Sequence, residues 1–302
     1  MSDERTSAAS LRAWLHGPGT KAHRWMALDD CCSAAQGKAQ LKLQLRLASI
    51  IERSEVWPLK LRRRAAVALL RLCSAGAPPD SARLQQAMAR SLALALPRDL
   101  ATPRVVPLLE PDECASLIDE ARAHGRAHGW QSLHRKYSTV DMPVSLLPSG
   151  EQLERLLRLR ALPLFAKLFG EQYGPASSLE FVHGSGLPGL FVVRYACGAA
   201  EHAQQGVSQR GLAGHVDESI CSLVLTLSEA SEYSGGGTRF ERSSPPVLKP
   251  DRGSAVLFLG KCWHEGVAIT SGERFVLVGL VNRRPNARGY AATGTVPVPT
   301  GT

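Results

Sequence analysis

The chain has 302 residues, of which 44% are hydrophobic and 21% are charged. These proportions are ordinary for a soluble globular protein, and the length suffices for one large domain with a helical extension. No run of about 18 apolar residues occurs, so we expect no transmembrane helix and no membrane partner. The N-terminus has no apolar core of the kind found in secretory signals, which argues against export by that route.

Positive charge is concentrated in the first third of the chain. Residues 1–100 hold 16 Lys and Arg against 8 Asp and Glu, which gives +8 of the net +9 of the whole chain. We predict a basic α-helical N-terminal region over 1–100. The basic run 60–64 has no interleaved aromatic residues and no DNA-binding motif, so a solvated helix face is favoured over a nucleic-acid site. Docking to an acidic partner or to RNA stays as the alternative.

The seven cysteines are odd in number and include no CxxC pair. We therefore expect neither a disulfide framework nor a thiolate zinc site, and a reducing compartment, the cytoplasm, is the predicted location. Ser, Ala and Arg among the first 30 residues keep organellar import as an alternative, although four acidic residues there argue against it. The sequence does not indicate an oligomeric state.

The N-terminal region is rich in good helix formers, and Pro or Asp stands at the expected helix starts. Three helices are predicted, at residues 38–53, 58–75 and 80–96. A domain boundary is expected at 97–103. Beyond it, a short apolar strand is predicted at 105–109. A helix start is predicted at 110–113, followed by an amphipathic stretch at 114–124, and a second helix is predicted at 151–170.

From about residue 179 the pattern becomes β. Short apolar runs, bounded by Gly, Pro, Ser or charged residues, occupy 189–196, 219–227, 253–259 and 275–281. Their near-continuous apolarity indicates strands buried on both faces, as in two sheets packed together. The predicted fold class is α+β, with a double-sheet core within 103–283. Residues 284–302 are predicted to form a flexible tail.

Three residues of types that bind metals occur at informative spacing in the β part. In Gly214-His215-Val216-Asp217, the His and the Asp stand at i and i+2, which a strand presents on one face. His264 follows 47 residues after Asp217, just beyond the apolar run 253–259. Two histidines and one carboxylate on one side of a metal form the facial triad of non-haem Fe(II) oxygenases. The alternative is two structural histidines and an aspartate that caps a helix.

Arg274 lies ten residues after His264, at the start of the last apolar run. A guanidinium pairs bidentately with a carboxylate, so this residue is a candidate anchor for the far end of a dicarboxylate whose keto-acid end chelates the metal. Gly235-Gly236-Gly237 lacks the Lys and the following helix of a phosphate-binding loop, so a tight turn is predicted there.

Several segments between residues 103 and 283 resemble the prolyl/lysyl hydroxylase branch of the Fe(II)/2-oxoglutarate dioxygenases. These segments are LLEPDECASLIDEA, FVVRYACG, GHVDES, EYSGGGTRF, LKPDRGSAVLF and HEGVAITSGERFVLVGLVN. EYSGGGTRF and HEGVAITSGERF are especially similar to the lysyl hydroxylase catalytic domain. The resemblance implies that the core is a double-stranded β-helix (jelly roll) with supporting helices.

The resemblance also implies residue roles. By it, His215, Asp217 and His264 are iron ligands, Arg274 binds 2-oxoglutarate, and Tyr195 hydrogen-bonds the same co-substrate. O2 is the implied second co-substrate, and L-ascorbate is the implied reductant of oxidised iron. The implied reaction hydroxylates an unactivated C–H bond, of a prolyl or lysyl residue in a protein, and releases succinate and CO2. Relatives with a small residue at the position of Asp217 halogenate, so this residue implies hydroxylation.

Three alternative functions stay open. The first is the same chemistry on a small molecule or a free amino acid. The second is demethylation of nucleic acid. Enzymes of that class usually have a second Arg six residues after the Arg that binds the co-substrate. In this chain Leu280 occupies that position, so nucleic acid is disfavoured as a partner. The third is a non-catalytic β-sandwich interaction module. The presence of all four triad and anchor residues argues against it.

Overall fold

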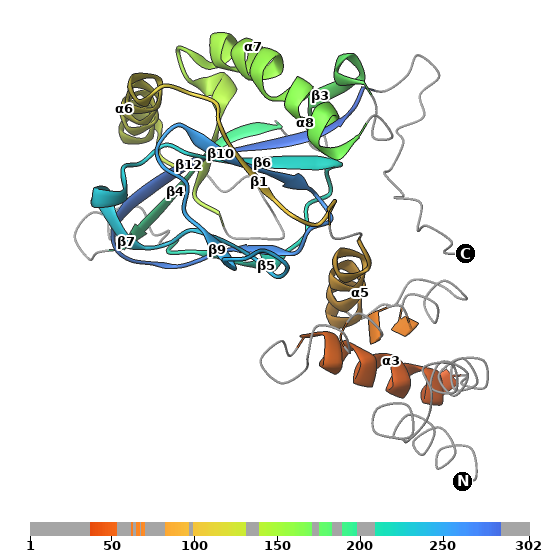
Figure 1. Cartoon of the computed structure of the whole chain (residues 1–302). Coiled ribbons are helices and arrows are strands. Elements are labelled where there is room, and N and C mark those ends of the chain that lie inside the picture. Colours follow the sequence, from red (N-terminus) through yellow and green to blue (C-terminus); the bar gives the residue numbers. More distant parts are fainter. Residues whose placement is uncertain are drawn as a thin grey trace. The chain divides into compact units, whose positions relative to one another are not determined.

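A computed structural model of the chain is shown in Figure 1. It describes residues 37–52, 62, 65–66, 68–69, 82–96, 99–130, 139–170, 175–182, 189–197 and 209–284. Contacts divide the chain into two compact units, residues 1–95 and 96–302. The larger unit contains every residue that the sequence singles out for the metal and co-substrate sites.

The smaller unit contains helices α3 (Gly37–Glu52) and α5 (Ala82–Ala95), close to two of the predicted helices. Their apolar faces form a buried cluster of Leu, Ile and Ala side chains. Buried Arg62 donates two hydrogen bonds, of 2.9 and 2.7 Å, to the carbonyl of Ile51 and so satisfies one acceptor in the last turn of α3. The helix predicted at 58–75 falls largely outside the described residues, and the buried Arg62 shows that the basic run is not solvated throughout.

In the larger unit, helix α6 (Pro111–His128) begins within the predicted helix start at 110–113 and continues four residues beyond the amphipathic stretch 114–124. It begins with Pro111, whose missing N–H costs nothing in the first turn of a helix. The Glu113 carboxylate accepts a hydrogen bond of 2.7 Å from the backbone N–H of Glu110, which closes a capping box.

The prediction of a single helix at 151–170 is wrong, because two helices occupy this segment. They are α7 (Gly150–Arg160) and α8 (Leu162–Phe169), and Pro163 stands in the first turn of the second. Proline has no N–H to donate within a helix, and its ring clashes with the carbonyl four residues earlier. The same residue is well suited to a first helical turn, so the chain ends one helix and starts another.

Twelve strands lie in the described part of the larger unit. They are β1 (Arg104–Pro107), β2 (Asp141–Pro143), β3 (Leu179–Phe181), β4 (Leu190–Cys197), β5 (Leu212–His215), β6 (Cys221–Thr226), β7 (Tyr233–Gly235), β8 (Thr238–Phe240), β9 (Val247–Leu248), β10 (Ser254–Leu259), β11 (His264–Gly266) and β12 (Ile269–Arg283). The four apolar runs of the sequence correspond to β4, β6, β10 and the central part of β12.

Two antiparallel sheets form the core. The larger sheet has the order β1-β10-β6-β12-β4-β2, with β3 and β7 also paired to β12, and the smaller has the order β5-β11-β8-β9. Strands β4, β6, β10 and β12 of the larger sheet alternate along the chain with strands of the smaller sheet. This winding is that of a double-stranded β-helix, so the predicted fold class is confirmed.

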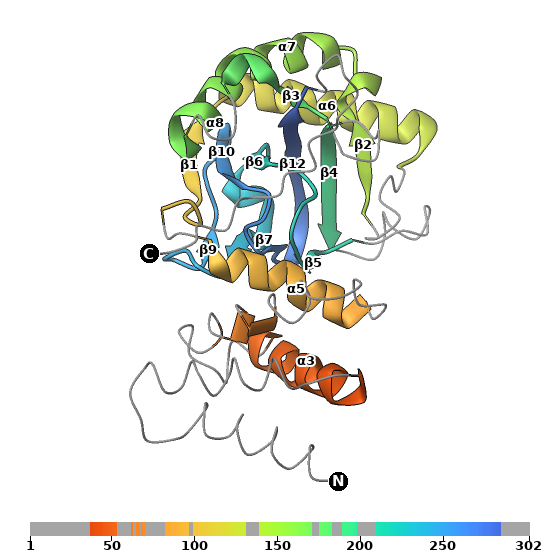
Figure 2. The ribbon, with the colours of Figure 1, turned by 90° about the vertical axis from the view of Figure 1, so that its right-hand side faces the viewer.

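Figures 1 and 2 show α6, α7 and α8 over one face of the larger sheet, and the smaller sheet over the other. Strands β6 and β10 therefore bury side chains on both faces, as their apolar sequences predict. Strand β12 has 15 residues and begins well before its apolar run. None of the described helices is long and apolar enough to cross a bilayer.

Candidate metal centre and co-substrate site

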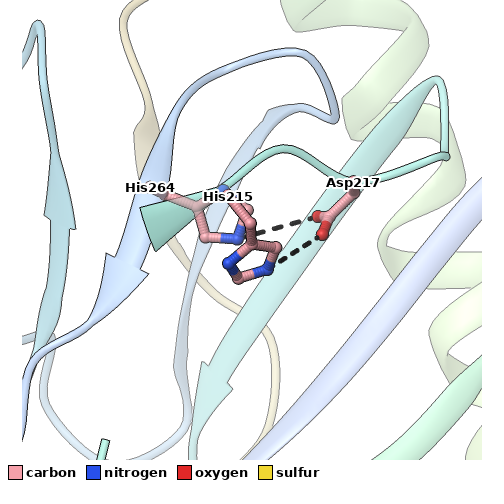
Figure 3. Close-up of side chains that lie close together, drawn as sticks. All are labelled: His215, Asp217 and His264. Carbon is pink, nitrogen blue, oxygen red and sulfur yellow. Dashed lines mark ion pairs between the residues drawn. The ribbon is translucent and has the colours of Figure 1, made fainter. Parts of the chain in front are cut away.

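The structure brings His215, Asp217 and His264 to one point (Figure 3). His215 ends β5 and His264 begins β11, and the two are paired across these neighbouring strands. One potential ligand atom from each residue lies within 4.8 Å of the other two. Nε2 of His215 is 3.4 Å from Oδ1 of Asp217, and Nε2 of His264 is 3.8 Å from Oδ2. The three side chains thus converge as the donors of a single metal ion would.

Asp217 reaches this point from a loop. The pairing of His215 with Asp217 was predicted from the alternation of side chains along a strand. Strand β5 ends at His215, so this reason is wrong. The backbone N–H of Asp217 instead donates to the carbonyl of Gly260 (2.8 Å), and Lys261 Nζ donates to the carbonyl of Asp217 (3.1 Å). The turn between β10 and β11 therefore holds the loop that carries the carboxylate.

Each imidazole is oriented by a backbone carbonyl two residues earlier in the chain. Nδ1 of His215 is 2.8 Å from the oxygen of Ala213, and Nδ1 of His264 is 3.0 Å from the oxygen of Cys262. A carbonyl can only accept a hydrogen bond, so in the neutral rings Nδ1 carries the proton and Nε2 presents a lone pair. A metal at the common point requires this tautomer.

Burial and mutual charge set the protonation of the cluster. Burial lowers the pKa of His264 to about 4, against the field of Asp217. Burial also opposes the charging of His215, but the hydrogen bond and charge of Asp217 outweigh it and raise its pKa. Burial opposes ionisation of Asp217 too, yet the two histidines and a hydrogen bond hold the pKa of this carboxyl below its usual range. The centre therefore contains a carboxylate and at least one neutral imidazole, a donor set suited to a divalent cation.

Arg274 is a buried cation between the sheets. Its side chain is 2% exposed, and its Nε has no hydrogen-bond partner in the described part of the chain. The guanidinium carbon lies 5.4 Å from the ring centre of Tyr195 and 5.9 Å from that of Tyr233. A buried charged donor without a partner is costly, so this arrangement indicates a bound anion that supplies the missing acceptor.

Tyr195 connects the arginine to the metal centre. It is the cross-strand neighbour of Arg274, so both side chains leave the larger sheet on the same face. Its hydroxyl approaches Gly266 of the smaller sheet so closely that a Cβ on this glycine would lie 2.9 Å from it. Gly266 stands two residues after His264 on β11, so the hydroxyl and this imidazole share the space between the sheets.

The glycine turn that the sequence predicts lies between β7 and β8, and all three glycines have positive φ. A Cβ on Gly236 would lie 3.3 Å from Cδ of Arg274. The turn thus forms part of the wall around the arginine side chain, a role that the sequence analysis did not identify. The same is true of Gly266, because a single glycine in a strand gives no signal for what lies opposite it.

Comparison with known proteins gives distant relatives. No family model matches the chain. It is 27% identical over 186 residues to the multifunctional procollagen lysine hydroxylase and glycosyltransferase LH3 of Rattus norvegicus, and 28% identical over 187 residues to the Caenorhabditis elegans multifunctional procollagen lysine hydroxylase and glycosyltransferase. Each match covers 58% of this chain and 23% of the relative, so the chain spans about a quarter of the length of these proteins.

The chain is distantly similar to the prolyl/lysyl hydroxylase type of 2-oxoglutarate-Fe(II) oxygenases, and it has the His-Asp-His donor set of an Fe(II) facial triad. Among solved structures, the chain is similar to a Pseudomonas putida prolyl-4-hydroxylase, with 19% identity and a TM-score of 0.43 over 60% of this chain and 92% of that one. It is also similar to the epimerase SnoN from nogalamycin biosynthesis, with 18% identity and a TM-score of 0.45 over 72% and 92%.

The residues of the site fit the metal and the co-substrate of this oxygenase type. Two imidazole nitrogens and one carboxylate oxygen are the donor set of the Fe(II) facial triad, which leaves the far side of the ion open. The buried Arg274 offers a partnerless donor to a carboxylate. His215, Asp217 and His264 would therefore hold the metal, and Arg274 and Tyr195 would hold the far end of 2-oxoglutarate.

Proposed function

We propose that this chain hydroxylates an unactivated C–H bond of a prolyl or lysyl residue in a protein. One molecule each of O2 and 2-oxoglutarate is consumed, the product gains one oxygen atom, and succinate and CO2 are released. The observation that carries the proposal is the convergence of His215, Asp217 and His264 in the same inter-sheet space as the buried Arg274. Bound Fe(II) supplies the oxidative chemistry when it is present.

The chain's own residues bind and orient the reactants. The carboxylate of Asp217 balances part of the metal charge, and the fixed tautomers of His215 and His264 present their Nε2 lone pairs. Arg274 pairs with the distal carboxylate of 2-oxoglutarate in a fork geometry. Burial raises the pKa of Tyr195, against the charge of Arg274, so its hydroxyl keeps its proton and can donate to the same carboxylate.

The choice of a protein substrate rests on the relatives. Curated proteins similar to this chain are named as procollagen lysine hydroxylases, and the similarity covers 58% of the chain. A small molecule or a free amino acid is the competing substrate class, and it is an outcome of the test described below. No feature of the described residues favours nucleic acid.

We further propose L-ascorbate as the reductant that sustains activity when turnover is uncoupled from substrate oxidation. Omission of ascorbate should shorten the period of linear turnover without changing the initial rate.

We also propose that the protein works in a reducing compartment such as the cytoplasm. The four described cysteines, Cys114, Cys197, Cys221 and Cys262, carry free thiols, which is consistent with a reducing compartment.

The test of the proposed function is turnover of the full chain with Fe(II), 2-oxoglutarate, O2 and ascorbate. Succinate is measured first without a substrate, then with pools of Pro- and Lys-containing peptides, and then with free proline and lysine. We expect peptides to accelerate succinate formation and to gain the mass of one oxygen atom. Acceleration by the free amino acids alone would favour the small-molecule alternative.

Two substitutions control this assay. His215→Ala should abolish both succinate formation and the mass gain, whereas His128→Ala, which removes an exposed histidine of α6, should leave them unchanged. Succinate formation by His215→Ala at the wild-type rate would contradict the proposal, because it would place the reaction elsewhere.

A further inference from the structure

Two buried hydroxyl groups form a chain that ends on the carboxylate of Asp217. Oγ of Ser222 donates to Oδ2 of Asp217 at 2.5 Å, and Oγ of Ser219 lies 2.7 Å from Oγ of Ser222. Ser222 is 0% exposed and Ser219 is 2% exposed. Neither residue belongs to the metal and co-substrate set identified above. Ser222 lies on the buried strand β6 and Ser219 lies just before it, where a buried hydroxyl needs a partner to offset its desolvation.

The direction of the hydrogen bonds follows from the chemistry of the three groups. Ionised Asp217 can only accept, so Ser222 must give its one proton to Oδ2. Ser222 then has only lone pairs left for Ser219, so the Ser219 hydroxyl must donate to Ser222. Both protons point toward the carboxylate, and each bond polarises and strengthens the next.

Ser222 is held more rigidly than a loop residue would be. It lies on β6, which is hydrogen-bonded to β10 on one side and β12 on the other. Its cross-strand neighbours are Phe258 and Leu280, and both are buried. Asp217 itself is carried by a loop, so the strand hydroxyl supplies the fixed point that the loop lacks.

We propose that Ser222, supported by Ser219, is a positioning residue that makes Asp217 bind the metal through a single oxygen. This inference rests on the proposed function, because it requires the metal centre. A carboxylate can offer one oxygen or two to a metal. Oδ2 lies 3.8 Å from Nε2 of His264 but accepts the hydrogen bond from Ser222, so Oδ1, which lies 3.4 Å from Nε2 of His215, is left to face the ion.

The consequence concerns the open side of the metal. Three protein donors leave an octahedral ion enough free positions for the two chelating atoms of 2-oxoglutarate and for O2. A second oxygen from Asp217 would take one of these positions. The hydroxyl chain therefore protects the space for a reactant and also stabilises the ligand in its binding orientation.

The test uses Co(II) and Mn(II) as redox-stable probes of the metal-free full chain. Ser222→Ala should weaken the binding of both ions by about 10- to 100-fold, the usual effect of removing a group that orients a ligand. It should also change the visible absorption spectrum of the Co(II) protein, because a second carboxylate oxygen raises the coordination number. Ser219→Ala should give a smaller change in the same direction, and Ser222→Thr should restore the affinity and the spectrum.

The matched control is Ser228→Ala. The Ser228 side chain is also buried, but its hydroxyl accepts a hydrogen bond from the backbone N–H of Phe275 (2.9 Å) and contacts none of the three metal-binding residues. It should lower thermal stability without changing the Co(II) affinity or spectrum. Thermal unfolding of each metal-free variant reports whether it is folded. If Ser222→Ala is not folded, Ser219→Ala and Ser222→Thr still test the proposal.

The outcomes separate this inference from the proposed function. If the wild type binds Co(II) and folded Ser222→Ala binds it with equal affinity and an unchanged spectrum, the positioning role is wrong and the metal centre stands. Equal losses in Ser222→Ala and Ser228→Ala would also overturn it, because the effect would then be one of stability. If the wild type binds neither ion, the metal centre and this inference both fall.

Discussion

The two ends of the site differ in how far the protein satisfies its own polar groups. At the metal end, backbone carbonyls bind both Nδ1 atoms, and Gly260, Lys261 and Ser222 bind Asp217. At the arginine end, the Arg274 guanidinium lies over two tyrosine rings, and its Nε has no partner among the described residues.

This difference indicates two kinds of preorganisation. The metal end is fixed before any ligand arrives, so its donors need little rearrangement to bind an ion. At the arginine end, Nε of Arg274 lacks a hydrogen-bond acceptor among the described residues, and an anion bound between the sheets would supply one. Metal binding and co-substrate binding should therefore be separable by substitution, because each end depends on different contacts.

The largest effect is expected from removing a metal donor. His215→Ala should weaken Co(II) binding by more than about 100-fold, since loss of a ligand exceeds the effect of losing a group that merely orients one. Calorimetric titration of the metal-free protein measures this affinity. His128→Ala is the control, and an affinity within error of the wild type in His215→Ala would show that the ion binds elsewhere.

Arg274→Met should weaken the binding of 2-oxoglutarate at the arginine end without affecting the metal end. Loss of one partner of a buried charge pair costs about 2–5 kcal/mol, so we expect 2-oxoglutarate to bind at least about 30-fold more weakly. Metal affinity should stay at the wild-type value. Arg239→Met, which removes a half-exposed arginine paired with Glu265, is the matched control. A parallel loss of metal affinity in Arg274→Met would mean that the two ends are not independent.

The pH should affect the metal end in a predictable direction. The raised pKa of His215 means that protons compete with the metal already above the ordinary histidine range, whereas His264, with a pKa of about 4, competes only in acid. Metal ligands must be deprotonated, so the apparent affinity should fall as the pH is lowered from 8 to 6, by up to about tenfold per unit. Co(II) titrations across this range measure it, and an affinity that rises toward pH 6 would contradict the assignment.

The smallest effect is expected from narrowing the space between the two ends. A Cβ on Gly266 would lie 2.9 Å from the Tyr195 hydroxyl, so Gly266→Ala must displace this ring or crowd the co-substrate. Overpacking of this kind costs about 1 kcal/mol or more, roughly a fivefold weakening of 2-oxoglutarate binding. Metal affinity measured on the same variant is the internal control. Unchanged affinity for 2-oxoglutarate would remove Tyr195 from the co-substrate site.

The sequence predicted the candidate site better than the reasons for it. The spacing of His215, His264 and Arg274 within β-type segments was sufficient to select them, because strands fix where such side chains emerge. Asp217 was selected for the wrong reason, since it reaches the centre from a loop tied to Gly260 and Lys261. Contacts between segments more than 40 residues apart in the chain cannot be predicted from the local sequence pattern.

The fold was predictable where apolar side chains repeat and was missed where they do not. Strands β6 and β10 are buried on both faces and stand out as apolar runs. The first third of β12 is polar, and β5 and β11 are too short to show a period, so no apolar run marks a strand there. The serines of the run 219–227 were the visible signal for the hydroxyl chain on Asp217, because a polar residue in a buried strand requires a partner.

The most direct test of the two-ended site is anaerobic absorption spectroscopy of the full chain with Fe(II) and 2-oxoglutarate. A visible charge-transfer band requires the keto acid to chelate an iron held by the protein. The wild type should develop this band, Arg274→Met should develop it only at much higher 2-oxoglutarate, and His215→Ala should not develop it at any concentration. Absence of the band in the wild type, or an equal band in His215→Ala, would contradict the account.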